Sequence, residues 1–338
     1  MCRWNAYFGE PILIEEPLYR TQHGLIAQSQ HASEGFELLN GDGFGIGWYD
    51  EFAEGHPPGR YRSVQPAWND VNLRELAAHV RTRLFLAHVR MTTGTPVQQT
   101  NCHPFRHGDW LFVQNGEIVD YPRIRRELML GVDPSLYNEI EGSTDSELMF
   151  FLALSFGLQD DPLGGLARAV GFIERVGRDA GIDHPVEMTA GFSDGRTLWA
   201  VRYGSGSQSR TLYESNDPET LREMYPDIER FQALGPEDRL VVSEPLGPME
   251  GVWREVPERT AVIVRPGEDE HVPFAARTPC SRPLRRCGRR RAAPPPGREP
   301  RRPSARRARR RRPPAGRRAG AGGSAASLRR PHRRAGAA

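Results

Sequence analysis

The chain has 338 residues, of which 38% are hydrophobic and 26% are charged, and its formal net charge at pH 7 is +3. That small charge hides an asymmetry, because 22 of the 46 basic residues but one of the 43 acidic residues follow Ala276. The body of the chain is therefore acidic, which disfavours nucleic acid as its main partner. No apolar run approaches the roughly 20 residues of a membrane span, and the N-terminus lacks a signal-peptide pattern. We expect a cytoplasmic protein with no membrane partner.

The segment 277–338 consists almost entirely of Arg, Pro, Ala and Gly. This composition buries too little apolar surface to offset the entropy of ordering, so we predict a disordered tail after a folded domain over 2–270. Two interpretations of the tail stay open. It is either an arm that binds polyanions or the product of out-of-frame translation of a GC-rich gene, since every basic residue in the chain is Arg and none is Lys.

Cys2 directly follows the initiator methionine, so removal of Met1 would leave a thiol and an α-amine on one residue. Their ordinary pKa values, about 8.5 and about 7.7 to 8.0, are close enough for the amine to take the thiol proton. N-terminal nucleophile enzymes work in this way. The alternative is that Cys2 merely begins a strand. The other cysteines, Cys102, Cys280 and Cys287, form no CxxC pair with it, so we expect no zinc site, disulfide framework or cofactor.

The first third of the chain alternates short strands and helices. We predict a buried strand over 2–8, a helix over 18–31, a glycine-rich turn and strand over 40–51 with its hairpin partner at 60–66, and a helix over 71–80. Glycines alternate along 41–47, which resembles a phosphate loop only weakly because no helix follows. They predict instead a close approach of the backbone to a neighbouring strand or to a ligand near Cys2.

A strand that starts near residue 84 ends in a loop holding Arg90, Thr92 and Thr93. An arginine leaving a buried strand needs an anionic partner, which is either structural or a ligand. Farther on, the apolar run 110–119 contains Asn115-Gly116, a pair that by itself predicts a tight turn.

The second half of the chain changes from helices to strands. Ser143 or Thr144 is placed to cap an apolar helix, and another helix is predicted over 163–180. Short strands with hairpin signals follow as far as residue 266. This order predicts an α+β fold of antiparallel sheets covered by helices.

Four blocks recur together in one order: a cysteine at position 2, then HVRMTTGT, VQNGEI and GSTDSE. Together they resemble the class II glutamine amidotransferase family, whose fold is a four-layer αββα sandwich of two antiparallel sheets. The resemblance extends over about 2–266. The blocks MCRWNAYFG, DGFGIGWY, NCHPF and VVSEPL are most similar to stand-alone members, including the γ-glutamyl hydrolases of ergothioneine synthesis.

The resemblance implies a role for each matching residue. Cys2 would attack a γ-carboxamide and form a γ-glutamyl thioester, while the side-chain amide of Asn115 and the backbone N–H of Gly116 would stabilise the oxyanion. Arg90 would bind the α-carboxylate of the substrate and Asp145 its α-ammonium.

Two further residues match the family and would support the site. Thr93 would support the binding of the substrate carboxylate by Arg90, and His103 would maintain the shape of its own loop. The chain also departs from the synthase branch, with Met91, Gly94 and Gln114 where that branch has tryptophan, histidine and histidine. These differences leave the amide-cleaving residues intact but weaken any expectation of a usual synthase partner.

The sequence thus favours a cysteine amidohydrolase acting on glutamine or a γ-glutamyl small molecule. Because nothing after 266 suits an ammonia-accepting domain, the acceptor would be water or a separate synthase. Two alternatives stay open: a glutaminase subunit that serves such a synthase, and an arginine-tail nucleic-acid-binding protein whose enzyme domain is an inactive relic.

Overall fold

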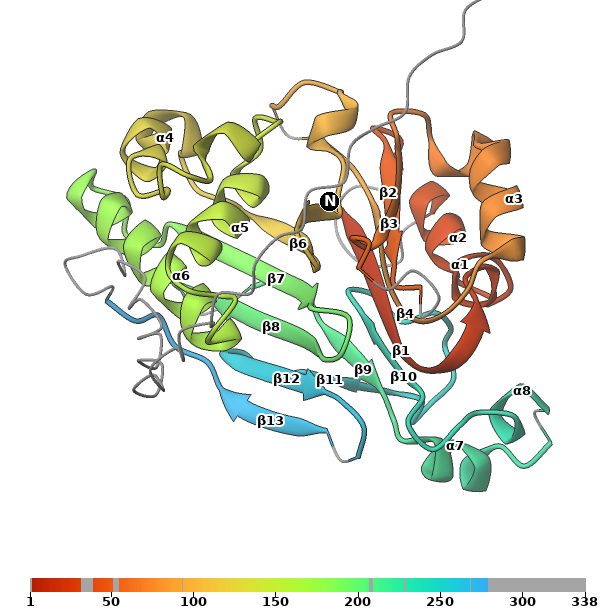
Figure 1. Cartoon of the computed structure of the whole chain (residues 1–338). Coiled ribbons are helices and arrows are strands. Elements are labelled where there is room, and N and C mark those ends of the chain that lie inside the picture. Colours follow the sequence, from red (N-terminus) through yellow and green to blue (C-terminus); the bar gives the residue numbers. More distant parts are fainter. Residues whose placement is uncertain are drawn as a thin grey trace, which may run out of the picture. The chain divides into compact units, whose positions relative to one another are not determined.

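The computed structural model describes residues 2–31, 39–50, 55–92, 94–206, 209–227, 229–267 and 269–278. Thr93 and the predicted tail from residue 279 onward lie outside them. The described residues form two antiparallel sheets with helices (Figure 1). None of the helices in these ranges is long and apolar enough to cross a membrane.

The first sheet, sheet A, contains seven strands in the order β11-β9-β10-β1-β4-β2-β3. The second, sheet B, contains six strands in the order β13-β12-β8-β7-β6-β5. The strands of sheet A are β1 (Arg3–Leu13), β2 (Phe44–Trp48), β3 (Gly59–Ser63), β4 (Arg81–Val89), β9 (Tyr213–Ser215), β10 (Arg239–Val242) and β11 (Trp253–Glu255). Those of sheet B are β5 (Phe105–His107), β6 (Trp110–Ile118), β7 (Val186–Ser193), β8 (Leu198–Gly204), β12 (Thr260–Val264) and β13 (Glu270–Pro273).

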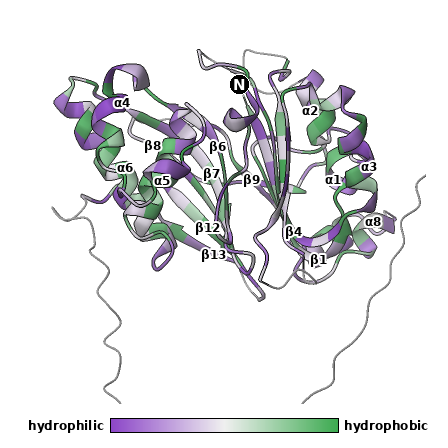
Figure 2. Cartoon of the chain, turned by 45° about the horizontal axis from the view of Figure 1, so that its top comes forward, coloured by the Kyte–Doolittle hydropathy of each residue, from purple (hydrophilic) through white to green (hydrophobic). Residues whose placement is uncertain are grey.

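Helices cover the two sheets on their outer faces, as Figure 2 shows for α1–α3 and α4–α6. The helices are α1 (Glu15–Tyr19), α2 (Leu25–Gln30), α3 (Val71–His79), α4 (Tyr121–Met129), α5 (Asp145–Ser155), α6 (Pro162–Asp179), α7 (Pro218–Met224) and α8 (Glu229–Gln232). Short 3-10 turns are η1 (Ala67–Asn69), η2 (Gln99–Asn101) and η3 (Tyr137–Glu139).

Three hydrophobic cores establish the order of the layers. One core joins α1–α3 to sheet A, another joins α4–α6 to sheet B, and a third lies between the sheets. Side chains alternate between the two faces of each strand and so contribute to two of these cores. In β1, Trp4 and Ala6 face the core between the sheets, while Tyr7 faces the helices. The predicted α+β fold with a four-layer αββα order is confirmed.

The alternating glycines of β2 let the two sheets approach closely. A Cβ atom on Gly45 would lie 2.1 Å from the carbonyl oxygen of His103, and one on Gly47 would lie 2.8 Å from Leu111. Contacts that short cannot accommodate a side chain. The prediction of a close backbone approach is therefore confirmed, and the neighbours at these two positions are protein groups that lead into or belong to sheet B.

Two local predictions are wrong. The helix expected over 18–31 is two short helices, α1 and α2, separated by a turn that ends at Gly24. The tight turn expected at Asn115-Gly116 is instead the interior of β6, which pairs with β7 from Leu111 to Ile118. Gly116 accommodates this with a φ of +139°, so the ladder of strand hydrogen bonds overrides the local preference for a turn.

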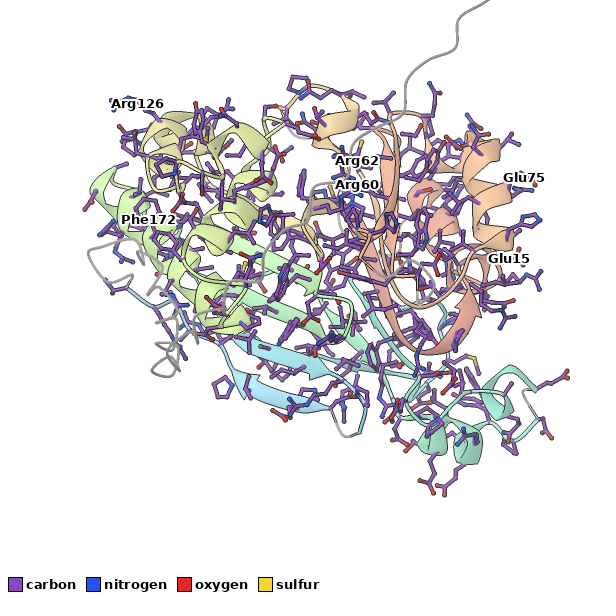
Figure 3. The ribbon with its side chains drawn as sticks, in the orientation of Figure 1. Glu15, Arg60, Arg62, Glu75, Arg126 and Phe172 are labelled. Carbon is purple, nitrogen blue, oxygen red and sulfur yellow. The ribbon has the colours of Figure 1, made fainter. Side chains whose placement is uncertain are left out.

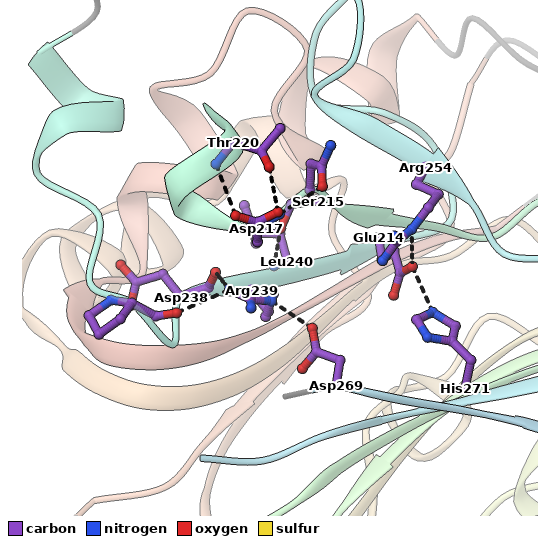
Figure 4. A network of polar contacts seen from close by, with 12 residues as sticks. Glu214, Ser215, Asp217, Thr220, Asp238, Arg239, Leu240, Arg254, Asp269 and His271 are labelled. Carbon is purple, nitrogen blue, oxygen red and sulfur yellow. Dashed lines mark hydrogen bonds and ion pairs between the residues drawn. The ribbon is translucent and has the colours of Figure 1, made fainter. Parts of the chain in front are cut away.

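Polar contacts connect the ends of the sheets that lie beside β9, β10 and β13 (Figure 4). The buried carboxylate of Glu214 accepts from Arg254 Nε and contacts His271 Nε2, each at 2.7 Å. Nearby, Arg239 Nε donates to Asp269 Oδ2 at 2.6 Å. These contacts link sheet A to the β13 edge of sheet B.

The described chain continues past β13. Phe274 is buried and packs edge-on against Tyr203, with 5.5 Å between ring centroids. The backbone N–H of Arg277 donates to the carbonyl of Ala167 in α6 at 2.9 Å. The packed part of the chain thus reaches residue 277.

We predict that truncation after Thr278 leaves the thermal midpoint and the activity unchanged, since it removes none of these contacts. Truncation after Pro273 should lower the free energy of unfolding by roughly 3 to 5 kcal/mol, as expected for loss of a buried phenylalanine. Denaturant unfolding of the two proteins measures the difference. Equal stabilities would show that the segment after β13 contributes nothing to the fold.

Candidate active site

Cys2 lies at the start of β1, beside the end of β4. Arg3 pairs with Val89, so the register continues to Cys2 opposite Arg90. The partly buried thiol donates to the carbonyl of Met91 at 3.3 Å, and the Met91 N–H lies 3.4 Å from the sulfur. Burial raises the pKa of the Cys2 thiol, although the Met91 backbone and Arg90 oppose the shift. A thiol in this setting needs a base in order to attack a substrate.

A buried ion pair anchors the N-terminal strand. Arg3 Nε donates to Glu244 Oε2 at 2.6 Å, and both side chains are 2% exposed. Arg3 also donates to the carbonyl oxygen of Cys2 at 3.0 Å, while the Trp4 N–H donates to Ser243 Oγ at 3.0 Å. These contacts hold the Cys2 backbone from one side. The sequence reasoning missed them, although MCRW and VVSEPL are the blocks that supply them.

Arg90 is 3% exposed, and its guanidinium contacts only uncharged groups among the described residues. It donates to Thr95 Oγ1 at 2.6 Å, to Thr92 Oγ1 at 3.2 Å and to the carbonyl of Asp42 at 3.3 Å. A buried cation without a carboxylate is costly unless an anion joins it. The described residues therefore do not include the anionic partner that was expected for Arg90.

Asn115 and Gly116 lie on β6, at an edge that β5 does not cover. Strand β5 pairs with β6 only as far as Phe112. The Val119 N–H points toward the β7 side, where it donates to Pro185, whereas the Ile118 N–H points the other way. Because N–H groups alternate along a strand, the Gly116 N–H projects from the same free edge as that of Ile118. No strand of the described residues pairs with this edge at Gly116, so its N–H is open to an incoming ligand.

Asp145 faces this free edge from the first turn of α5. Thr144 caps the helix by accepting from the Glu147 N–H at 3.2 Å, as predicted. The Asp145 carboxylate accepts from the N–H groups of Ile118 and Ser146, each at 2.8 Å. Burial raises the pKa of Asp145, and these two backbone groups oppose the shift. No cation pairs with it among the described residues.

The fold thus gathers residues far apart in sequence. Arg90 and Asp145 both act electrostatically on the Cys2 thiol. Glu117, which the sequence reasoning missed, lies one residue beyond Gly116. Burial raises the pKa of Glu117, Arg210 opposes the shift, and Asp145 adds to it. The site therefore presents the Arg90 cation and the Asp145 carboxylate to one thiol.

The His103 ring stacks on the His88 ring and lies tilted against the Phe105 ring. Its centroid lies 4.0 Å from that of the His88 ring and 4.4 Å from that of the Phe105 ring. Both histidines are buried, and none of their four ring nitrogens has a hydrogen-bond partner among the described residues. Arg62 of β3, labelled in Figure 3, donates to the Cys102 carbonyl at 3.2 Å and so holds the loop before His103.

Burial keeps both histidines uncharged. It lowers the pKa of His88 to about 3, with Arg90 adding to the shift and the Gln114 backbone opposing it. It lowers the pKa of His103 well below 6.5, with His88, Arg90 and Arg62 adding to the shift.

We predict that these groups make the fold sensitive to acid. A histidine with a depressed pKa in the folded state contributes stability above its unfolded pKa of about 6.5, and that stability is lost as the pH falls toward the folded value. When the pH falls from 7.5 to 5, protonation of His88 in the unfolded state should lower the free energy of unfolding by roughly 2 kcal/mol. Denaturant unfolding should show a loss smaller by about that amount in His88→Phe. Identical losses in both proteins would mean that His88 is already protonated at pH 5.

Comparison with known proteins places this geometry in a family. The family described as glutamine amidotransferases class-II matches residues 31–283. The chain belongs to this family. The match includes Arg90, Asn115, Gly116 and Asp145, while Cys2 precedes it.

Relatives of this class II glutamine amidotransferase span most of its described fold. A probable glutamine amidotransferase, DUG3, of Saccharomyces cerevisiae is 31% identical over 78% of this chain and 82% of its own length. A γ-glutamyl-hercynylcysteine sulfoxide hydrolase of Mycolicibacterium smegmatis is 29% identical over 80% and 98%, respectively. The chain is thus similar both to an amidotransferase and to a γ-glutamyl hydrolase.

Solved structures agree on the fold. A glutamine aminotransferase class-II domain protein from Silicibacter pomeroyi is 33% identical, with a TM-score of 0.61 over 82% of this chain and 100% of that one. Glutamine phosphoribosylpyrophosphate amidotransferase from Bacillus subtilis is 15% identical, with a TM-score of 0.54 over 82% of this chain and 50% of that one. The second likeness supports the sandwich fold alone.

Proposed function

We propose that this class II glutamine amidotransferase hydrolyses a γ-glutamyl amide with Cys2 as the nucleophile. The observation that carries the proposal is a pair of unmatched charges near the thiol, the buried Arg90 and the partly buried Asp145. Among the described residues, Arg90 has no carboxylate partner and Asp145 has no cationic one. The α-carboxylate and α-ammonium of a glutamyl group would supply one partner to each.

The chemistry follows from the groups present. After removal of Met1, the α-amine of Cys2 takes the thiol proton and the thiolate adds to the γ-carbonyl carbon. The Asn115 amide and the Gly116 N–H donate to the resulting oxyanion. Collapse breaks the C–N bond, the amine leaves with the proton returned by the α-ammonium, and a γ-glutamyl thioester remains. Water then attacks the thioester, which releases glutamate and restores the thiol.

For the substrate, we favour glutamine or a γ-glutamyl small molecule with water as the acceptor. The similarity to a γ-glutamyl sulfoxide hydrolase supports this choice. Ammonia release from glutamine by the isolated protein would agree with it. Release that requires an added acceptor enzyme would instead favour delivery to a separate synthase.

We predict that Arg90→Ala and Asp145→Ala each lower kcat/KM for glutamine, because each leaves one substrate charge unpaired in the site. The fall should correspond to a loss of roughly 2 to 5 kcal/mol of transition-state stabilisation. The glutamine analogue without an α-amine separates the two roles, since Asp145→Ala should affect its turnover little. Arg126→Ala, on the exposed side of α4, is the matched control. An Asp145 variant that loses activity equally on both substrates would contradict the ammonium contact.

A further inference from the structure

Two separate segments of the chain carry the charges that would bind a glutamyl group. The loop after β4 begins with Arg90, whose guanidinium donates to Thr95 Oγ1 at 2.6 Å. The turn before α5 ends at the helix cap Thr144, and Asp145 begins the helix. Among the described residues, no hydrogen bond or ion pair joins Arg90 to Asp145. Their separation therefore depends on how the two segments are held together.

The side chain of Asn101 connects the two segments. It lies at the end of η2 and is 0% exposed. Its Nδ2 donates to the Pro96 carbonyl at 2.9 Å and to Ser143 Oγ at 3.2 Å, while its Oδ1 accepts from the Ser143 N–H at 2.8 Å. One buried amide thus holds the residue directly after Thr95 and the residue two positions before Asp145.

Close packing supports the same connection. A Cβ atom on Gly142 would lie 2.5 Å from Asn101 Oδ1 and 2.8 Å from the Thr100 carbonyl oxygen, so a side chain at 142 would push the segments apart. The buried Glu147 carboxylate accepts from the Gly142 N–H at 2.7 Å and so holds this turn against the first turn of α5. The turn that leads to Asp145 therefore lies directly against η2.

These contacts require an amide at position 101. The Pro96 carbonyl needs a donor and the Ser143 N–H needs an acceptor, and an asparagine side chain offers one of each. A carboxylate would place a second acceptor against the Pro96 carbonyl. Alanine would leave both backbone groups without this partner, which is costly for buried polar groups.

We propose that Asn101 is a positioning residue that sets the separation of Arg90 and Asp145, and with it the preference for substrates that carry both an α-carboxylate and an α-ammonium. This inference rests on the proposed function. Asn101 acts through Thr95 on one side and through the cap of α5 on the other. A substrate that uses both charges needs their separation to match its own, since small misplacements cost large factors in rate, whereas a substrate with one charge can shift within the site.

The test compares wild-type enzyme with Asn101→Ala on L-glutamine and on two analogues, one without the α-amine and one without the α-carboxylate. For L-glutamine, kcat/KM should fall about tenfold or more, mostly through KM, whereas for each analogue it should fall less than about threefold. Asn216→Ala is the matched control, because it removes another amide that holds a turn, the one between β9 and α7. It should leave the preference for L-glutamine unchanged. Equal falls on all three substrates, or no fall in Asn101→Ala, would overturn the proposal.

Thr95→Val tests the same connection from its other end. It keeps Asn101 and its hydrogen bonds but removes the hydroxyl through which the connection reaches Arg90. It should also lower the preference for L-glutamine over the two analogues. An unaltered preference would show that Asn101 does not act on Arg90 through this loop.

Hydrogen exchange gives a readout that does not depend on activity. In Asn101→Ala, the backbone amides of 94–98 and of 141–145 should exchange faster than in the wild-type protein, while those of β7 should not change. Unchanged exchange in either segment would reject the connection even if the enzyme hydrolyses glutamine. Faster exchange in both segments, with a wild-type protein that does not hydrolyse glutamine, would reject only the proposed function.

Discussion

Cys2→Ser should lose turnover by about a thousandfold or more, with the fold unchanged. A hydroxyl ionises far less readily than a thiol, and removal of a covalent nucleophile commonly abolishes nearly all of kcat. Burial raises the pKa of the Cys2 thiol, while Met91 and Arg90 oppose the shift. A serine hydroxyl at this position would be buried in the same way and starts from a much higher pKa, so the loss of activity should be large. Steady-state ammonia release from glutamine measures the change.

Cys287→Ser is the control, since it removes a thiol that has no role in the proposed mechanism. It should keep full activity. Near-normal turnover in Cys2→Ser, by contrast, would remove Cys2 from the nucleophilic role and leave the family fold without its proposed chemistry.

Asn115→Ala should lower kcat by about a hundredfold to a thousandfold with a small change in KM. The oxyanion exists only along the reaction path, so the donor stabilises the transition state more than the bound substrate. Asn115 is 4% exposed on β6, where truncation opens little of the strand to water. Initial rates over a range of glutamine concentrations separate kcat from KM.

The matched control is Asn138→Ala, which removes an exposed amide and should change neither constant. An increase in KM alone for Asn115→Ala would mean that this amide binds the substrate before the reaction begins, which would contradict the oxyanion role.

Local signals in the sequence predicted those elements whose stability is local. The helix expected over 71–80 is α3, which Asp70 caps by accepting from the Leu73 N–H at 2.7 Å. The strand expected at 60–66 is the hairpin partner of β2. In both cases, the residues that determine the structure are neighbours in the chain.

Predictions failed where distant residues decide the structure. Asn115-Gly116 has the composition of a turn, but eight paired residues of β7 hold it in a strand. Helix α4 is an exception with a local cause, since no side chain caps it and its first turn follows Asp120 in a left-handed conformation. The ion pair of Arg3 with Glu244 joins residues separated by 241 positions.

The candidate site likewise contains residues that the sequence indicated and contacts that it did not. The family resemblance pointed to Cys2, Arg90, Asn115 and Asp145. The structure places Cys2 opposite Arg90 at the end of β4, and Asp145 beside the end of β6, the strand that carries Asn115. The resemblance did not identify the stacking of the His88 ring on the His103 ring, because the two rings come from different segments of the chain. A single sequence carries no signal for such a contact.

Intact mass spectrometry of the active enzyme, before and after reaction with a glutamine analogue that carries an electrophilic diazoketone, tests the central claim most directly. We predict a chain without Met1 that gains the mass of one analogue less N2, which leaves as the Cys2 sulfur is alkylated. The label should map to the N-terminal peptide at Cys2, glutamine hydrolysis should be lost in step with labelling, and glutamine should protect. An active enzyme that retains Met1, or inactivation with the label on Cys102 and an unmodified Cys2, would contradict the N-terminal cysteine mechanism.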